Sequence, residues 1–86
     1  MTMWSEQRIL LLGRALHKGH LIVEDATAIY GRGNGGEEAL RLFVNMGLLR
    51  LREDMSGAWF EIVKGAEFPQ EAFEAASRLK RLGEKK

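Results

Sequence analysis

Apolar side chains recur at three- and four-residue intervals through the first part of the chain, which is the pattern of amphipathic helices. The segment from Ser5 to Lys18 is the first predicted helix, because Ser5 is a suitable N-cap and Gly19 a suitable end. Its apolar side consists of Ile9, Leu12 and Leu16. A short apolar stretch from Leu21 to Val23 then predicts a brief strand.

Two shorter helices are predicted on either side of a glycine-rich turn. Glu24 to Tyr30 is the second helix, with acidic residues in its first turn, where the helix dipole favours them. The sequence GRGNGG, residues 31–36, ends it, because four glycines in six residues remove helix propensity. Glu37 to Met46 is the third helix, with Gly47 as its end and an inward face of Leu40, Phe43 and Val44.

After Gly47 the hydrophobic period changes from about 3.6 residues to about 2, which predicts a β-hairpin. One face of this hairpin should be buried and consists of Leu49, Leu51, Phe60 and Ile62. The opposite face should be exposed and consists of Arg50, Arg52, Trp59 and Glu61. Residues 54–57 form the predicted turn, so Leu51 is expected near Phe60 and Arg52 near Trp59.

A fourth helix is predicted from Pro69, a residue that suits the first turn of a helix, to Leu82. Its apolar stripe consists of Phe73, Ala76 and Leu79, and residues 83–86 are expected to form a frayed tail. The sequence shows neither a linker nor an internal repeat. We therefore interpret residues 1–86 as a single α+β, mainly helical domain whose core lies in residues 5–64.

Composition narrows the class of protein. With 45% hydrophobic and 29% charged residues, the chain is in the range of soluble globular proteins. It has no run near the ~20 apolar residues of a membrane-spanning helix, so we expect a cytoplasmic protein that does not contact membranes. The chain contains no cysteine, which excludes disulfides, thiolate metal sites and cysteine nucleophiles.

The net charge of +1 conceals an uneven distribution. Residues 32–52 hold four arginines against two glutamates, residues 53–74 hold six acids against one lysine, and residues 75–86 hold five bases against one glutamate. Either these blocks are ordinary solvated faces, or the first of them is a functional basic face.

The order of predicted elements resembles the winged helix-turn-helix superfamily, and three segments carry the resemblance. LIVEDATAIYG, residues 21–31, is similar to the second-helix segment of that family. EEALRLFVNMGLLRLRED, residues 37–54, is similar to its third helix and first wing strand, and GAWFEIV, residues 57–63, to the returning strand. The resemblance covers residues 5–64 and implies a three-helix domain with a short strand and a two-stranded wing, here with an added C-terminal helix.

The resemblance also implies a DNA-binding protein of the transcription-regulator type. In that family the third helix enters the major groove while the wing and the turn hold phosphates. By position, the residues that would contact duplex DNA are Arg32, Gly36, Glu37, Glu38, Arg41, Asn45, Arg50 and Arg52. The sequence departs from the family's basic surface at four carboxylates that would oppose phosphate: Glu37, Glu38, Glu53 and Asp54.

These carboxylates favour a second hypothesis, in which the domain contacts protein as a small accessory or inhibitor subunit of a nucleic-acid-processing complex. Trp59 belongs to the exposed strand face. It is either covered within the chain by Trp4, Phe68 or Phe73, or it anchors an interface with a partner. The stripe of Phe73, Ala76 and Leu79 is the candidate surface for a homodimer.

The sequence predicts neither catalysis nor a cofactor. Gly31, Gly33 and Gly36 match G-x-G-x-x-G, but that motif binds dinucleotides only between a strand and a helix of a parallel unit. His17 and His20 are interpreted as surface histidines near a helix end, because no third ligand accompanies them as a metal site requires. The serines fall at a cap, a turn and a helix surface, so no nucleophile is expected.

Overall fold

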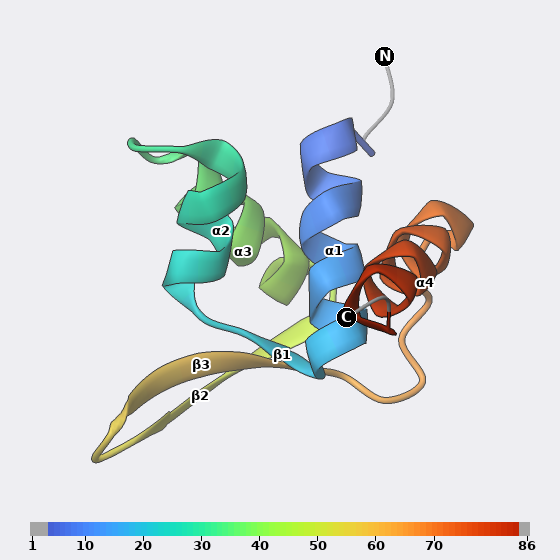
Figure 1. Cartoon of the computed structure of the whole chain (residues 1–86). Helices are drawn as coiled ribbons and strands as arrows, with labels where there is room; N and C mark the ends of the chain where they lie inside the picture. The colour runs from blue at the N-terminus through green and yellow to red at the C-terminus, as the bar shows by residue number, and fades with distance from the viewer. Residues whose placement is uncertain (1–3, 85–86) are drawn as a thin grey trace.

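Residues 4–84, the part of the chain that the structure describes, form four helices and three strands in a computed structural model (Figure 1). In order, the elements are α1 (Glu6–Lys18), β1 (His20–Leu21), α2 (Val23–Tyr30), α3 (Gly35–Asn45), β2 (Leu49–Asp54), β3 (Gly57–Ile62) and α4 (Gln70–Glu84). The predicted α+β, mainly helical class is confirmed.

Helix α1 begins and ends at the residues predicted to cap it, Ser5 and Gly19. The Ser5 side chain accepts a hydrogen bond from the Arg8 backbone N–H at 3.3 Å, and Gly19 ends the helix in the left-handed region at φ 88°. At the other end of the chain, α4 continues to Glu84, two residues beyond the predicted helix end at Leu82. Residues 1–3 and 85–86 lie outside the described residues.

The three strands form one antiparallel sheet in the order β1-β3-β2. The predicted register is confirmed, with Leu51 paired to Phe60 and Arg52 to Trp59. The turn is shorter than predicted, because Asp54 and Gly57 already belong to the strands. The Asp54 carboxylate stabilises this two-residue turn by accepting hydrogen bonds from the Ser56 N–H at 2.8 Å and the Ser56 hydroxyl at 2.6 Å.

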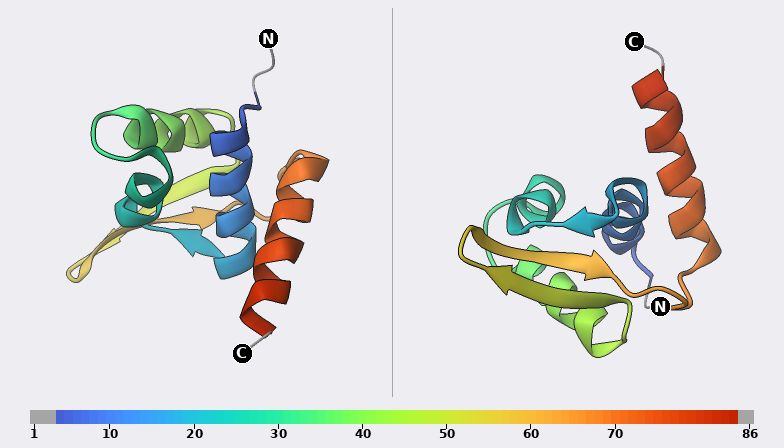
Figure 2. Two further views of the ribbon diagram at one scale, coloured as in Figure 1. Left: turned by 45° about the horizontal axis from the view of Figure 1, so that its top comes forward. Right: turned by 90° about the horizontal axis from the view of Figure 1, so that it is seen from below.

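Helix α1 lies in the middle of the molecule, with α2 and α3 on one side and α4 on the other (Figure 2). The largest fully buried side chains come from α1, α3 and the start of the sheet: Leu11, Leu12, Leu21, Leu40, Phe43 and Leu49. The prediction that Leu51 is buried is wrong. Its side chain is 46% exposed, because it lines an open hollow between α3 and the hairpin instead of being packed against α3. Beyond this position the hairpin projects past the helices (Figure 1).

Small residues allow two pairs of helices to approach closely. In the contact between α2 and α3, a Cβ added to Gly36 would lie 2.9 Å from the Ala26 Cβ. In the contact between α1 and α4, a Cβ added to Gly13 would lie 2.6 Å from the Ala75 Cβ. Real Cβ atoms do not approach this closely, so both positions require glycine.

An ion-paired carboxylate, Asp25, joins α1 to the start of α2. Asp25 is only 3% exposed, and it accepts hydrogen bonds from Arg14 Nε at 2.6 Å, Lys18 Nζ at 2.9 Å and the Ile22 N–H at 2.8 Å. Burial acts to raise the pKa of Asp25, but the Ile22, Lys18 and Arg14 hydrogen bonds and the Lys18 charge outweigh it and hold that pKa below its ordinary value. Asp25 therefore orients α2, and with it the turn that leads to α3.

Candidate nucleic-acid interface

The exposed side of α3 carries the polar residues that the sequence assigned to a DNA contact. Glu37, Glu38, Arg41 and Asn45 are all exposed. Arg41 lies one turn after Glu37, and its guanidinium is 3.9 Å from the Glu37 carboxylate, with both side chains largely in solvent. An exposed pair at this distance contributes about 0–1 kcal/mol, so Arg41 can readily exchange this partner for another anion.

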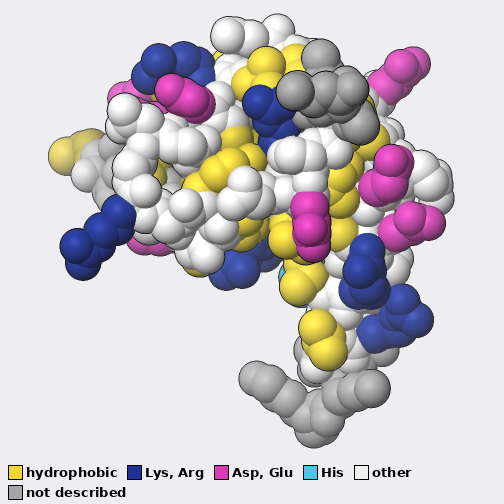
Figure 3. Space-filling model, turned by 90° about the horizontal axis from the view of Figure 1, so that it is seen from above, with side chains coloured by type: hydrophobic (Ala, Val, Ile, Leu, Met, Phe, Trp, Pro, Cys, Tyr) yellow, Lys and Arg dark blue, Asp and Glu magenta, His cyan; other side chains and the backbone are white. Residues whose placement is uncertain are grey.

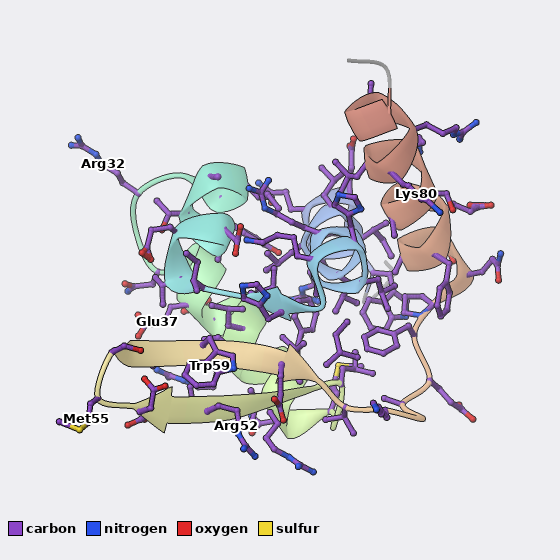
Figure 4. The ribbon with its side chains drawn as sticks, turned by 60° about the horizontal axis from the view of Figure 1, so that its bottom comes forward. Arg32, Glu37, Arg52, Met55, Trp59 and Lys80 are labelled. Atoms are coloured by element: carbon purple, nitrogen blue, oxygen red, sulfur yellow. The ribbon has the colours of Figure 1, made fainter. Side chains whose placement is uncertain are left out.

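The glycine-rich turn places Arg32 at a protruding point of the molecule, as Figure 4 shows. Gly31 and Gly33 adopt positive φ values of 79° and 110°, which side chains rarely allow. Gly36 differs from its prediction: it is buried against Ala26 within α3 and does not face outward. The prediction that Gly36 lies on the exposed face is wrong, because the sequence does not show how closely α2 approaches α3.

The two arginines of β2 lie on a different surface from α3. A hollow of about 260 Å³ between α3 and the hairpin is lined by Glu37, Arg41, Val44, Leu51 and Phe60, so Leu51 and Phe60 face α3. Because side chains alternate along a strand, Arg50 and Arg52 point to the opposite side of the sheet. The predicted DNA-contacting residues are thus divided between the α3 side and the far side of the hairpin.

Cations and carboxylates are interspersed over the surface, and Figure 3 shows this from above. On the hairpin, the Arg52 guanidinium is 3.8 Å from the Glu61 carboxylate. At its tip, hydrogen bonds from Ser56 lower the pKa of Asp54, so this carboxyl remains charged at neutral pH. The adjacent Met55 is fully exposed, as predicted for a residue of the turn.

Trp59 is half-buried on the far side of the hairpin, in a hollow of about 490 Å³ that it lines with His20, Ile22 and Glu61. The three aromatic residues that the sequence suggests as a possible cover for Trp59 contact other rings. Trp4 stacks on Phe43 with ring centroids 6.4 Å apart, and Phe68 meets Phe73 edge to face at 6.2 Å. Neither of these two ring contacts involves Trp59, and none of the three rings lines its hollow.

The predicted stripe on α4 is partly used within the chain. Ala76 and Leu79 are half-buried, whereas Phe73 is 46% exposed and lines a hollow of about 320 Å³ with Leu16 and His17. The innermost line of α4 consists instead of Ala72 and Ala75, which are buried against α1. The helix is therefore held on the domain by small residues.

Sequence reasoning placed Glu61 on the same strand face as Trp59, but it did not bring His20 beside Glu61. They become neighbours because β1 pairs with β3, which places His20 directly opposite Glu61. Among the described residues, no group of three His, Cys, Asp or Glu side chains is placed to hold a metal ion. Within residues 4–84, likewise, none of the helices is both long and apolar enough to cross a membrane.

Comparison with known proteins gives no relative from which a function can be transferred. No protein-family model, no curated protein and no solved structure matches this chain. Its function must therefore be argued from its own residues.

Proposed function

We propose that this chain is a winged-helix domain that binds duplex DNA, with α3 in the major groove and the β2–β3 hairpin as the wing. One observation carries the proposal: α2 and α3 are joined by a tight turn, and the hairpin that follows pairs through β3 with β1, in the order β1-β3-β2. This arrangement leaves one long side of α3 exposed beside the hairpin, as a recognition helix requires.

The exposed side of α3 has the dimensions and the donors that base recognition needs. Its 11 residues span roughly 16 Å at about 1.5 Å per residue, and a major groove about 12 Å wide admits a helix. Arg41 and Asn45 lie one turn apart on this side and are of the types that bind guanine and adenine edges. Glu38 can accept a hydrogen bond from the cytosine amino group.

The turn between α2 and α3 supplies contacts to the phosphate backbone. Arg32 protrudes from it (Figure 4), and Gly33 and Gly35 are exposed near the start of α3, where a helix N-terminus attracts an anion. Contacts of this kind set the register of a protein on DNA, while base contacts provide specificity. Arg32 and Arg41 are the two cations that this assignment makes essential.

A mobility shift with duplex DNA tests the proposal. The double variant Arg32→Ala with Arg41→Ala should bind at least about tenfold more weakly than the unaltered protein, because it loses one phosphate and one base contact worth roughly 1–3 kcal/mol each. The matched control is Arg78→Ala with Arg81→Ala, which removes the same charge from exposed positions on α4. Equal effects of the two double variants would contradict binding through α3.

A further inference from the structure

The far side of the hairpin presents a cluster of aromatic and basic side chains that duplex binding through α3 does not use. We call it the outer hairpin face and define it by five residues: His20, Arg50, Arg52, Trp59 and Glu61. The strand register arranges them in two rows, with Arg52 opposite Trp59 in one row, and with Arg50, Glu61 and His20 side by side in the next. Figure 4 shows Arg52 and Trp59 over the same side of the hairpin.

The indole of Trp59 is accessible within this face. It is half-buried and borders the hollow of about 490 Å³, which is also lined by His20 of β1 and by the residues on either side of β1, Gly19 and Ile22. β1 pairs only with Phe60 and Glu61 of β3. The edge of β3 that faces β1 therefore has no neighbouring strand at Trp59. A flat aromatic group can therefore enter beside the indole without displacing a described element of the fold.

The charges of the face suit a polyanion better than a peptide. Around Trp59, Arg50 and Arg52 stand against Glu61, while Asp54, on the same side of β2 by alternation, lies one row nearer the tip. Arg52 and Glu61 are 3.8 Å apart with side chains 51% and 37% exposed. Such a pair is weak in water, so a phosphate can replace Glu61 as the partner of Arg52. The two rows are separated by two residues of strand, roughly 7 Å, which is of the order of the phosphate spacing in an extended strand of nucleic acid.

We propose that the outer hairpin face binds single-stranded nucleic acid, with one base stacked on Trp59 and the flanking phosphates held by Arg50 and Arg52. A stacked base needs an exposed aromatic ring, and arginines beside it neutralise the backbone, which is how sequence-tolerant single-strand binding is built. Bases within a duplex are already stacked on one another, so the intact duplex does not offer this contact.

This inference goes beyond the proposed duplex binding and does not depend on it, because the residues of the two surfaces are different. Arg41 lines the hollow on the α3 side of the hairpin and Arg32 lies in the turn before α3, whereas Trp59 and Arg52 belong to the outer hairpin face. A chain that binds duplex DNA but not single strands, or the reverse, would therefore separate the two proposals.

Tryptophan fluorescence of the 86-residue chain tests the stacking directly. In a Trp4→Phe background, which keeps an aromatic ring against Phe43, Trp59 is the only tryptophan. Addition of a 12-nucleotide oligothymidylate at low salt should quench its emission, and added salt should restore it. Absence of quenching at saturating oligonucleotide would overturn the proposal.

Variants then locate the site by the anisotropy of a labelled oligothymidylate. Trp59→Ala should weaken binding roughly 5- to 150-fold, the range measured for loss of one stacked base, while Trp59→Phe should retain most of it. Arg52→Ala should reduce the dependence of log K on log salt by about 0.7. Circular dichroism of each variant shows whether it is folded.

The matched control is Arg32→Ala with Arg41→Ala, which should leave single-strand binding within about twofold, because its residues lie on the other side of the sheet. If this control abolished single-strand binding while Trp59→Ala left it intact, the strand would be held by α3 and the inference would be wrong. If no nucleic acid bound and a protein partner instead required Trp59, the inference would also be overturned.

Discussion

Gly36 of α3 packs directly on Ala26 of α2, and no side chain fits between them. A Cβ on Gly36 would lie 2.9 Å from the Ala26 Cβ and 3.1 Å from the Ala26 carbonyl carbon. This contact holds the start of α3 against α2 and thereby fixes the direction in which Glu37 and Arg41 point. Gly36, the last glycine of residues 31–36, is thus a packing residue.

We expect Gly36→Ala to destabilise the domain by about 1–3 kcal/mol, the usual cost of overpacking a well-filled contact. The sign of this change in stability is informative, because a glycine-to-alanine substitution at an open position within a helix stabilises the folded state by up to about 1 kcal/mol. Urea denaturation followed by circular dichroism measures the change. Glu38→Ala, at an exposed position of the same helix, should change stability by less than about 0.5 kcal/mol. A stabilised Gly36→Ala variant would contradict the close contact.

Helix α4 is held on α1 through Gly13, which lies against Ala75. Gly13→Ala should therefore lower the free energy of unfolding by about 1–3 kcal/mol. The double variant Gly13→Ala with Ala75→Gly should recover part of this loss, because it removes the Ala75 Cβ that the new methyl would meet 2.6 Å away. A double-mutant cycle in urea measures the coupling, and strictly additive effects would show that the two residues do not touch.

Asp25 makes the stability of the domain depend on acid pH. Because folding holds the pKa of Asp25 below its ordinary value of 3.8, its charged form stabilises the folded state above that pH. This contribution is lost as the pH falls through the lower folded-state pKa. Asp25→Asn should cost about 1–3 kcal/mol at pH 7, and the difference between the two proteins should shrink below about pH 4. Thermal unfolding at pH 7 and pH 3 checks this, and a constant difference would contradict the assignment.

Glu37 is expected to weaken duplex binding, since its carboxylate lies beside Arg41 on the side of α3 that faces phosphate. Glu37→Gln removes a repulsion on the order of 1 kcal/mol and frees Arg41, so affinity for duplex DNA should rise by about two- to tenfold. Glu71→Gln on α4 removes the same charge from another exposed position and should have less effect. Weaker binding by Glu37→Gln would instead indicate that Glu37 accepts a hydrogen bond from a base.

The sequence was sufficient to predict each helix and the hairpin register, because those depend on local periodicity and on caps such as Ser5 and Gly19. It could not predict features that depend on which elements meet. Leu51 has the spacing of a buried residue, yet an open hollow separates it from α3 and leaves its side chain 46% exposed. Asp25 was understood only as a favourable residue at a helix start, because its cationic partners, Arg14 and Lys18, lie on a different helix.

The candidate site was predicted in part. The polar side of α3 follows from helical spacing, and Arg50 and Arg52 share a strand face by alternation. That this strand face points away from α3 depends on which side of the sheet the helices occupy, which no local pattern reveals. Gly36 was placed on the exposed side because an exposed glycine and a tightly packed one look alike in a sequence.

The central claim, that α3 and the glycine-rich turn bind duplex DNA, is tested most directly by the salt dependence of affinity for a fluorescent duplex. The account predicts that log K falls linearly with log salt, and that Arg32→Ala reduces the slope by about 0.9, the value for one phosphate contact. Arg78→Ala on α4 should leave the slope unchanged. Undetectable binding to duplex at low ionic strength, or a slope that Arg32→Ala does not alter, would contradict the claim.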